Sequence, residues 1–218
     1  MSHLFTQCGA LHAPKIMADT DAGPVRVFGW ETDARSPEYA DFLRALLPQL
    51  MDELRALGIA DHTYFHISDE PSEAMLADYA AARALVAPYV DGCPIIDALS
   101  SLKFYASGIV KKPIPGINHL QEFVDAGVPG LWTYYCVSQY KAVSNLFMAM
   151  PAARTRMLGA QLYKYDIEGF LQWGYNFYNS QYSLYPIDPY AVTDADGVFP
   201  AGDAFQVYPG ANGEPEES

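Results

Sequence analysis

The sequence predicts an α/β protein in which helices cover a parallel sheet. Half of the 218 residues are hydrophobic, which is enough to build a sizeable core. Apolar runs of strand length alternate with segments whose apolar residues recur at helical spacing. The strand-like runs are apolar on both faces, as in a sheet that is covered on both sides. Such chains close into β/α barrels or wind as open sheets, and no G-x-G-x-x-G or P-loop motif supports the nucleotide-binding open form.

The first predicted helix has clear start and stop signals. Ser36 is a suitable N-cap, and Pro37 favours the first helical position. Apolar residues then recur at helical spacing over residues 38–57. Pro48 should kink this helix or split it in two, and Gly58 should end it.

Strands and helices alternate along the rest of the chain. We expect strands over residues 63–68, 93–99, 130–137 and 169–178, and helices over residues 73–90, 118–127 and 151–165. These are four or five strands at most, whereas a closed barrel of this kind needs eight. We therefore expect either further strands within residues 12–30 or a chain that is part of a larger domain. The acidic segment 211–218 is rich in Gly and Pro and is expected to be a flexible tail.

Charge and cysteine content narrow the class of protein. The net charge of −13 argues against nucleic acids and anionic membrane surfaces as partners, because both repel an acidic protein. We see no apolar run that would span a bilayer and no secretory signal, so we expect a cytoplasmic location. The three scattered cysteines form no C-x-x-C pair, so neither a disulfide framework nor a zinc site is indicated. We predict no metal and no cofactor.

Two adjacent carboxylates, Asp69 and Glu70, directly follow the predicted strand at 63–68. In parallel α/β folds the carboxyl ends of the strands carry the catalytic groups. We expect Pro71 to hold Glu70 in an extended conformation. Two close carboxylates resist double ionisation, so one should keep its proton near neutral pH, as glycoside hydrolysis requires. The alternative is that both acids merely cap the following helix.

The later strands lack a second catalytic acid. A conventional retaining glycosidase needs a nucleophilic carboxylate, but residues 130–137 and 169–178 contain no acid. Asp97 is a lone polar residue in its strand, which is more typical of a hydrogen-bonded structural role. This favours a mechanism in which the 2-acetamido oxygen of the substrate is the nucleophile. Asp69 would then orient and polarise the acetamido N–H, and Glu70 would protonate the leaving oxygen. Missing barrel segments could still supply an acid.

Aromatic residues on the later strands are candidate sugar contacts. Aromatics make up 14% of the chain, with 16 tyrosines. Trp132 and Tyr134 share one strand face, and Trp173 and Asn176 lie near the end of the last strand. Indole rings pack against the apolar face of a pyranose, and a tyrosine hydroxyl can hold the acetamido oxygen. His66, which precedes the acid pair, is a further candidate for binding the sugar. Core packing is the alternative for His66 and for both tryptophans.

Several stretches resemble a known family. They are "FGWETDARSPEYADFLRALLPQL", "YFHISDEP", "SNLFMAMPAARTRMLGAQLYKYDIEGFLQWGYNFY" and "VYPG". Over about Ala13 to Gly210 the chain resembles the bacterial domain of unknown function 4091, the catalytic portion of glycoside hydrolase family 123, the β-N-acetylgalactosaminidases. The resemblance implies a (β/α)8 TIM-type barrel and substrate-assisted retaining hydrolysis. Asp69 would be the stabiliser and Glu70 the general acid/base. The blocks that contain Trp132, Tyr134, Trp173 and Asn176 resemble the sugar pocket of that family.

Three hypotheses about function follow. The leading one is that residues 1–210 form the C-terminal part of a barrel that hydrolyses terminal β-linked N-acetylhexosamine, with N-acetylgalactosamine favoured. The second is a glycosidase of another specificity with a conventional two-carboxylate mechanism. The third is a non-catalytic fragment that binds carbohydrate or is inactive. An incomplete barrel would expose strand edges, so we also expect self-association.

Overall fold

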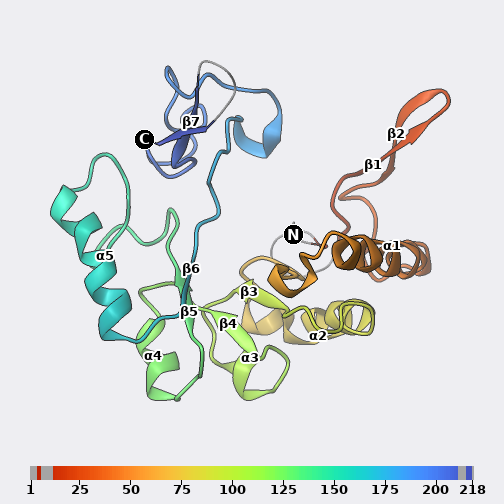
Figure 1. Cartoon of the computed structure of the whole chain (residues 1–218), viewed down its shortest axis with the longest axis horizontal. Coiled ribbons are helices and arrows are strands. Elements are labelled where there is room, and N and C mark those ends of the chain that lie inside the picture. Colours follow the sequence, from red (N-terminus) through yellow and green to blue (C-terminus); the bar gives the residue numbers. More distant parts are fainter. Residues whose placement is uncertain (1–3, 6–11, 211–214, 218) are drawn as a thin grey trace. The chain divides into compact units, whose positions relative to one another are not determined.

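The computed structural model describes residues 4–5, 12–210 and 215–217. The chain divides into two compact units, Met1–Ile114 and Pro115–Ser218, and Figure 1 labels the elements of both. The described strands form four two-stranded sheets, two parallel and two antiparallel. The predicted α/β class is therefore confirmed as a mixed α/β fold with small sheets.

Helix α1 (Pro37–Ala56) begins and ends where the sequence predicts. The Ser36 side chain accepts a hydrogen bond from the backbone N–H of Tyr39 at 3.3 Å, so Ser36 is the N-cap. Gly58 has a φ of +70°, and the N–H of Ile59 donates to the carbonyl oxygen of Leu54 at 3.0 Å. This pattern is the Schellman motif, in which a left-handed glycine satisfies the last carbonyl groups of a helix.

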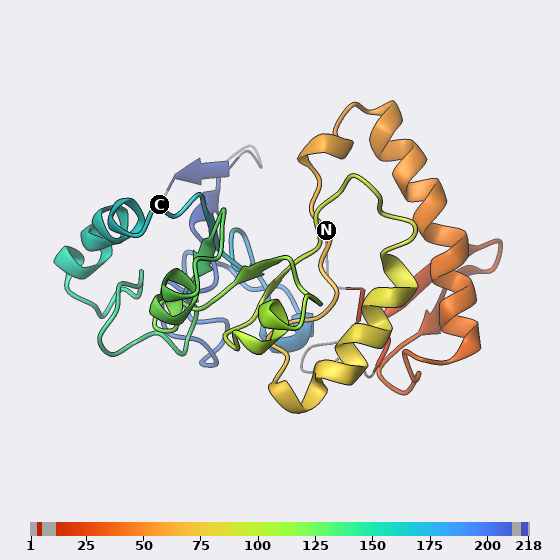
Figure 2. The ribbon, with the colours of Figure 1, turned by 90° about the horizontal axis from the view of Figure 1, so that it is seen from below.

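Pro48 does not split the helix, because α1 runs through this residue without interruption, and a kink there stays a prediction. Five buried side chains line the inner face of the helix: Tyr39, Leu43, Leu47, Met51 and Leu54. They recur every three or four residues, and α1 contacts α2 (Leu76–Val86), as the two neighbouring helices in Figure 2 show. Burial of this stripe outweighs the loss of one backbone hydrogen bond at the proline.

Residues 12–30 do not add parallel strands to the first unit. Strands β1 (Ile16–Thr20) and β2 (Gly23–Phe28) form an antiparallel hairpin, which extends away from α1 in Figure 1. Its register shifts between Ile16 and Met17, and the two strands pair with each other as a separate two-stranded sheet. Residues 12–30 therefore contain two strands, but these are antiparallel and are not the additional parallel barrel strands that the sequence allowed.

Parallel pairing in the first unit lies beside the segment that precedes the acid pair. Strand β3 (Ile96–Ala98) pairs in parallel with β4 (Lys112–Ile114), and Phe65 forms a parallel bridge with Ile95. Among the described residues, the predicted strand at 63–68 thus has one β-bridge, and the N–H of Phe5 donates to the carbonyl oxygen of Ile67 at 3.1 Å. The short helical elements are η1 (Ala60–His62), η2 (Glu73–Met75) and α3 (Lys103–Ala106). The predicted helix at 73–90 begins as η2 and continues as α2.

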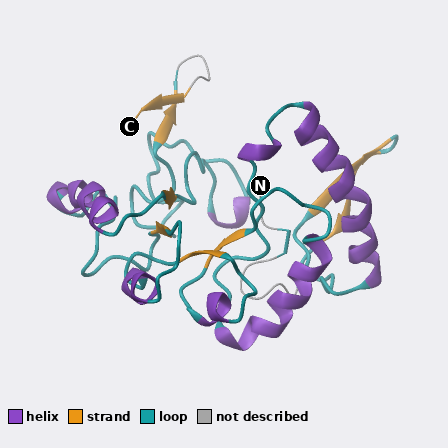
Figure 3. Cartoon of the chain, turned by 60° about the horizontal axis from the view of Figure 1, so that its bottom comes forward, coloured by secondary structure: helices purple, strands orange, loops and turns teal. Residues whose placement is uncertain are grey.

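The second unit is richer in loops, as Figure 3 shows. Strands β5 (Trp132–Tyr134) and β6 (Gly169–Leu171) are parallel neighbours. The remaining elements are α4 (Leu120–Asp125), α5 (Ala152–Lys164), η3 (Gln181–Ser183), β7 (Val207–Pro209) and β8 (Pro215–Glu217). Strand β8 falls within the expected flexible tail, of which residues 211–214 and 218 lie outside the described residues. Among the helices described, none has the length and apolar character to cross a membrane.

Candidate functional site

The acid pair lies on a turn that is fastened to the end of β3. Phe65, Ile67 and Ser68 are buried, Asp69 is half-buried and Glu70 is exposed. The backbone N–H of Glu70 donates to the carbonyl oxygen of Ala98, the last residue of β3, at 2.9 Å. The sequence predicts this location, because the carboxyl end of a parallel strand is where catalytic groups are found in α/β folds.

The backbone at Glu70 differs from the expected extended form. Its φ is +43°, in the left-handed region that non-glycine residues rarely adopt. The expectation that Pro71 keeps Glu70 extended is therefore wrong. The backbone hydrogen bond to Ala98 and the turn between the buried segment and η2 override the local preference. A left-handed non-glycine residue costs on the order of 1–3 kcal/mol, and such residues cluster at functional sites.

Neither of the two acids occupies the cap position of a following helix. Helix η2 begins at Glu73 and its N-cap is Ser72, while α2 has Met75 at its N-cap. Neither cap residue makes a side-chain cap hydrogen bond. Both acids precede the cap position, so capping does not explain why they are adjacent.

Asp97 holds the segment that leads to the acid pair. Its carboxyl group is fully buried, and both oxygens lie 3.1 Å from the backbone nitrogen of Ile67, which donates to them. The Tyr79 hydroxyl donates to Oδ2 of the same carboxylate. As predicted, Asp97 has a hydrogen-bonded structural role. Burial raises the pKa of Asp97, and the hydrogen bonds from His66 and Tyr79 oppose that rise.

His66 lies against Asp97. Its Nδ1 is 3.3 Å from Oδ1 of Asp97, and its side chain is 13% exposed. This contact ties His66 to the network that fixes the turn. A direct sugar contact by His66 stays a prediction.

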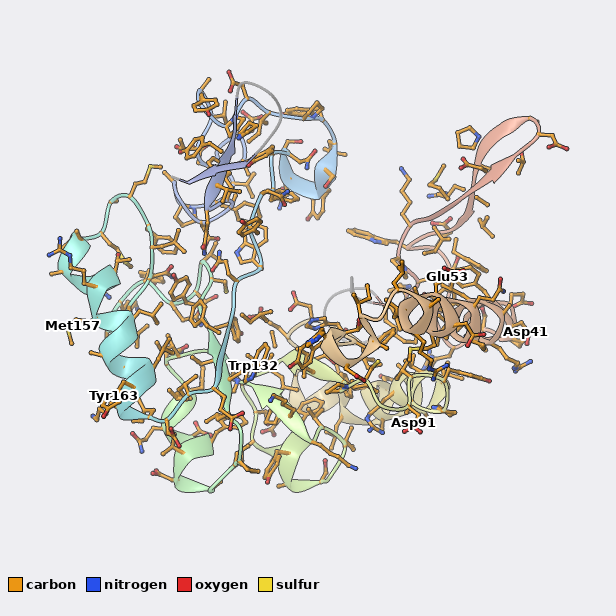
Figure 4. All side chains as sticks on the ribbon, in the orientation of Figure 1. Asp41, Glu53, Asp91, Trp132, Met157 and Tyr163 are labelled. Atoms are coloured by element: carbon orange, nitrogen blue, oxygen red, sulfur yellow. The ribbon has the colours of Figure 1, made fainter. Side chains whose placement is uncertain are left out.

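In the second unit, Trp132 lies directly over the neighbouring strand. Gly169 is its partner in the β5–β6 register, and a Cβ at Gly169 would lie 2.1 Å from Cε2 of the indole. The absence of a side chain at Gly169 therefore makes room for this ring. Figure 4 labels Trp132 on the ribbon. Tyr134, two residues further along β5, is buried.

Trp173 is 40% exposed and is held from three directions. Its ring packs edge-on against Phe199, with centroids 4.9 Å apart, and against Phe177 at 5.5 Å. Its indole N–H donates to Oδ2 of Asp203 at 3.2 Å. Sequence patterns did not indicate Asp203, which is 30 residues away and follows no predicted strand. Only the long-range pairing of its segment brings it to Trp173.

That pairing joins residues 172–177 to residues 203–206. Asn176 forms an antiparallel bridge with Phe205, and the N–H of Phe177 donates to the carbonyl oxygen of Ala204 at 3.2 Å. A Cβ at Gly174 would lie 2.5 Å from that same oxygen. The two backbones can approach this closely only because residue 174 is glycine. The predicted strand at 169–178 thus ends as β6 at Leu171 and continues as this irregular pairing.

Burial controls the charge of Asp203. The residue is fully buried, and burial raises its pKa to about 6, although the hydrogen bond from Trp173 acts in the opposite direction. Burial also raises the pKa of Tyr135 to about 12, and the charge of Asp203 contributes to that rise. Within the part of the chain that the structure describes, no group of three or more His, Cys, Asp or Glu side chains could hold a metal ion.

The predicted site residues divide between the two units. His66, Asp69 and Glu70 belong to the first unit, and Asp97 must be added to them as the residue that holds their segment. Trp132, Tyr134, Trp173 and Asn176 belong to the second unit, and Asp203 must be added there.

Comparison with known proteins identifies the family. No curated protein matches the chain. The model of the family "Glycoside hydrolase 123, catalytic domain" matches residues 1–218. One similar solved structure comes from a study titled "The details of glycolipid glycan hydrolysis by the structural analysis of a family 123 glycoside hydrolase from Clostridium perfringens". Its TM-score is 0.60 at 17% identity, over 94% of this chain and 35% of that chain, so the likeness is one of fold and the chain spans about a third of that protein. The family resemblance is confirmed: the chain belongs to the glycoside hydrolase 123 catalytic domain family.

Proposed function

We propose that the chain carries the catalytic acids of a glycoside hydrolase that cleaves terminal β-linked N-acetylhexosamine, with N-acetylgalactosamine favoured. One observation carries the proposal. In a member of a glycoside hydrolase family, two adjacent carboxylates lie on a strained turn at the carboxyl end of β3. Capping does not require that strain, whereas strained residues cluster at active sites, where the strain can fix the direction of a side chain.

The proposed reaction needs no nucleophile from the protein. The acetamido carbonyl oxygen of the substrate attacks C1, and the bond between C1 and the leaving oxygen breaks. Glu70 donates its proton to that oxygen and becomes a carboxylate. The Asp69 carboxylate accepts a hydrogen bond from the acetamido N–H and stabilises the positive charge of the cyclic intermediate. Glu70 then takes a proton from the water that opens this intermediate at C1, and the product keeps the β configuration.

Four side chains of the second unit are proposed to bind the sugar. Trp132 and Trp173 would stack on pyranose faces, while Tyr134 and Asn176 would hydrogen-bond polar groups of the sugar. The exposure of Trp173 supports this role, because a tryptophan that only fills the core is not 40% exposed.

The strand pairing within each unit is compatible with a (β/α)8 barrel. Each unit contains a parallel strand pair, β3–β4 in the first and β5–β6 in the second. Parallel pairs with helical connections are the building units of such a barrel. We propose that the chain supplies part of that barrel.

Asp203 raises the question of a conventional two-carboxylate mechanism, since it is an acid beside a proposed sugar contact. A nucleophilic carboxylate must be ionised and must reach C1 of the sugar. Asp203 is fully buried, and burial raises its pKa to about 6. A fully buried carboxylate does not reach C1 of a bound sugar, so the substrate-assisted mechanism is the better supported. An aryl glycoside without the acetamido group separates the two, because efficient cleavage of it would require a protein nucleophile.

Leaving-group dependence tests the roles of the two acids. We expect Glu70→Gln to slow hydrolysis of substrates with poor leaving groups by roughly 10²–10⁴-fold, and that of activated aryl substrates far less, because only the former need protonation. Asp69→Asn should slow both, since the cyclic intermediate forms in either case. Glu73→Gln is a matched control: this exposed acid lies three residues on and pairs with Lys103 instead. Equal losses for the Asp69 and Glu70 variants on both kinds of substrate would contradict the proposed roles.

A further inference from the structure

The carboxyl group of Asp203 makes one specific side-chain contact. Its Oδ2 accepts the indole N–H of Trp173 at 3.2 Å. Its Oδ1 is also buried and accepts no hydrogen bond from the described residues. A buried oxygen without a partner destabilises the folded state. Fold stability alone therefore does not explain an acid at this position.

The environment of Trp173 suggests what the acid does. The rings of Phe177 and Phe199 pack against the indole at centroid distances of 5.5 and 4.9 Å. These apolar contacts restrict the ring but do not define which way its N–H points. The hydrogen bond to Asp203 does, because the N–H is the indole's single donor. The ring is thus fixed while 40% of the residue stays exposed.

We propose that Asp203 is a positioning residue, which fixes the Trp173 indole so that its exposed surface is ready to stack on a sugar ring. Asp203 is itself fully buried, so it acts through Trp173 and does not touch the sugar. The inference rests on the proposed function in one respect, namely that the ligand of Trp173 is a sugar. Pre-orientation matters because a ring that must be immobilised on binding loses side-chain entropy and with it affinity.

The titratable groups around Asp203 make the contact sensitive to pH. Tyr135 is the titratable residue of the neighbouring segment that interacts with the Asp203 charge, and it stays neutral because burial raises its pKa to about 12. Trp173 contributes its uncharged N–H, and Gln172 donates its amide to the backbone oxygen of Asp203 at 3.2 Å. Asp203 is therefore the group that changes charge near pH 6, where burial places its pKa. A carboxylate accepts the indole N–H more strongly than a protonated carboxyl group does.

Tryptophan emission tests the contact without reference to activity. The chain has three tryptophans, so the difference between wild type and Trp173→Phe isolates the signal of Trp173. We expect this signal to shift with a midpoint near pH 6 in the wild type and to be flat in Asp203→Asn, which keeps an acceptor oxygen but does not titrate. Trp30→Phe is the control, because Trp30 is exposed and belongs to the first unit; it should leave the shift unchanged. A pH shift that persists in Asp203→Asn would overturn the proposal.

Steady-state kinetics then test the consequence for the sugar. With an activated aryl N-acetylgalactosaminide, Asp203→Leu should raise KM about 5–10-fold, as expected for one lost hydrogen bond, with kcat within about twofold because no reacting atom is touched. Asp203→Asn should show an intermediate KM that no longer varies between pH 5 and 7.5. Asp196→Asn, a nearby exposed acid that interacts with Tyr185, is the matched control. An unchanged KM in both Asp203 variants would refute the positioning role.

If the folded wild type cleaves no N-acetylhexosaminide, the proposed function fails, and the emission titration still decides the Asp203–Trp173 contact.

Discussion

Glu70 combines a proposed catalytic role with a backbone conformation that disfavours any side chain. Its φ of +43° brings the Cβ close to the backbone, and the hydrogen bond from its own N–H to the carbonyl oxygen of Ala98 holds the turn. For a residue with a side chain this conformation costs on the order of 1–3 kcal/mol. The backbone conformation of Glu70 therefore lowers the stability of the folded protein while it fixes the direction of one carboxyl group.

Two substitutions at Glu70 measure that cost. Both Glu70→Gly and Glu70→Ala remove the carboxyl group, but only alanine keeps a Cβ. We expect the glycine variant to be more stable than the alanine variant by about 1 kcal/mol in urea unfolding, the reverse of their usual order. If the alanine variant is as stable as the glycine variant, or more so, Glu70 is not strained in the folded protein.

Asp97 should be required for a well-ordered site. Asp97→Ala leaves the N–H of Ile67 and the hydroxyl of Tyr79 without their acceptor in a buried environment. We expect a loss of about 2–4 kcal/mol of unfolding free energy, measured by urea unfolding. Asp41→Asn on the surface of α1 should change stability by less than about 0.5 kcal/mol, because its ion pair with Arg44 is exposed. If the two substitutions change the free energy of unfolding by similar amounts, the hydrogen bonds to Asp97 do not stabilise the folded protein.

At the scale of elements, the β5–β6 pair depends on one glycine. A Cβ at Gly169 would lie 2.1 Å from the Trp132 ring, so Gly169→Ala must displace the indole or separate the strands. We expect a loss of about 1–3 kcal/mol and a change in tryptophan emission. Gly159→Ala is the matched control, because Gly159 lies in α5 and a Cβ added there would meet no other atom within 4 Å. That substitution should stabilise the protein by about 0.5–1 kcal/mol, and a loss as large as that of Gly169→Ala would contradict the assignment.

Helices were predictable from the sequence because their signals are local. The cap at Ser36 and the stop at Gly58 act within one turn of α1, and both are observed. Strand length was overestimated, because apolar composition does not say where backbone pairing ends: the strand predicted over 169–178 is regular only to Leu171. Strand β4 was missed because it has three residues, one of them Pro113.

In the candidate site too, the residues that a local sequence pattern marks were predictable, and those that depend on long-range contacts were not. Asp69 and Glu70 stand out because they are adjacent in the sequence and follow an apolar run. Asp203 could not be found in this way, since its contact with Trp173 spans 30 residues and arises from an irregular antiparallel pairing. The left-handed turn at Glu70 was also hidden, because a tertiary hydrogen bond overrides the preference imposed by Pro71.

For the whole molecule, buried acids should make stability depend on pH. Burial raises the pKa of Asp203 from the ordinary 3.8 to about 6, and it also raises that of Asp97. Between about pH 4 and pH 6 the folded state therefore binds more protons than the unfolded state. The contribution of Asp203 to the free energy of unfolding must then fall as pH rises through this window and level off above it.

The contribution of Asp203 can be isolated by urea unfolding of wild type and Asp203→Asn between pH 4 and pH 7.5. The difference between the two proteins should change by roughly 2 kcal/mol across the window, in favour of the variant at higher pH, after allowance for solvent screening. Contributions from Asp97 and from the net charge of −13 are shared by both proteins. Parallel pH profiles would show that Asp203 titrates normally.

The central claim is that Asp69 and Glu70 catalyse hydrolysis of a β-linked N-acetylhexosamine. The most direct measurement is hydrolysis of phenyl 2-acetamido-2-deoxy-β-galactoside and its gluco isomer by the purified chain, beside Asp69→Asn, Glu70→Gln and Glu73→Gln. The proposal predicts cleavage that is faster for the galacto isomer, unchanged in Glu73→Gln and lost in both other variants. Failure of a cooperatively folded chain to cleave either isomer, or full activity in Asp69→Asn and Glu70→Gln, would contradict it.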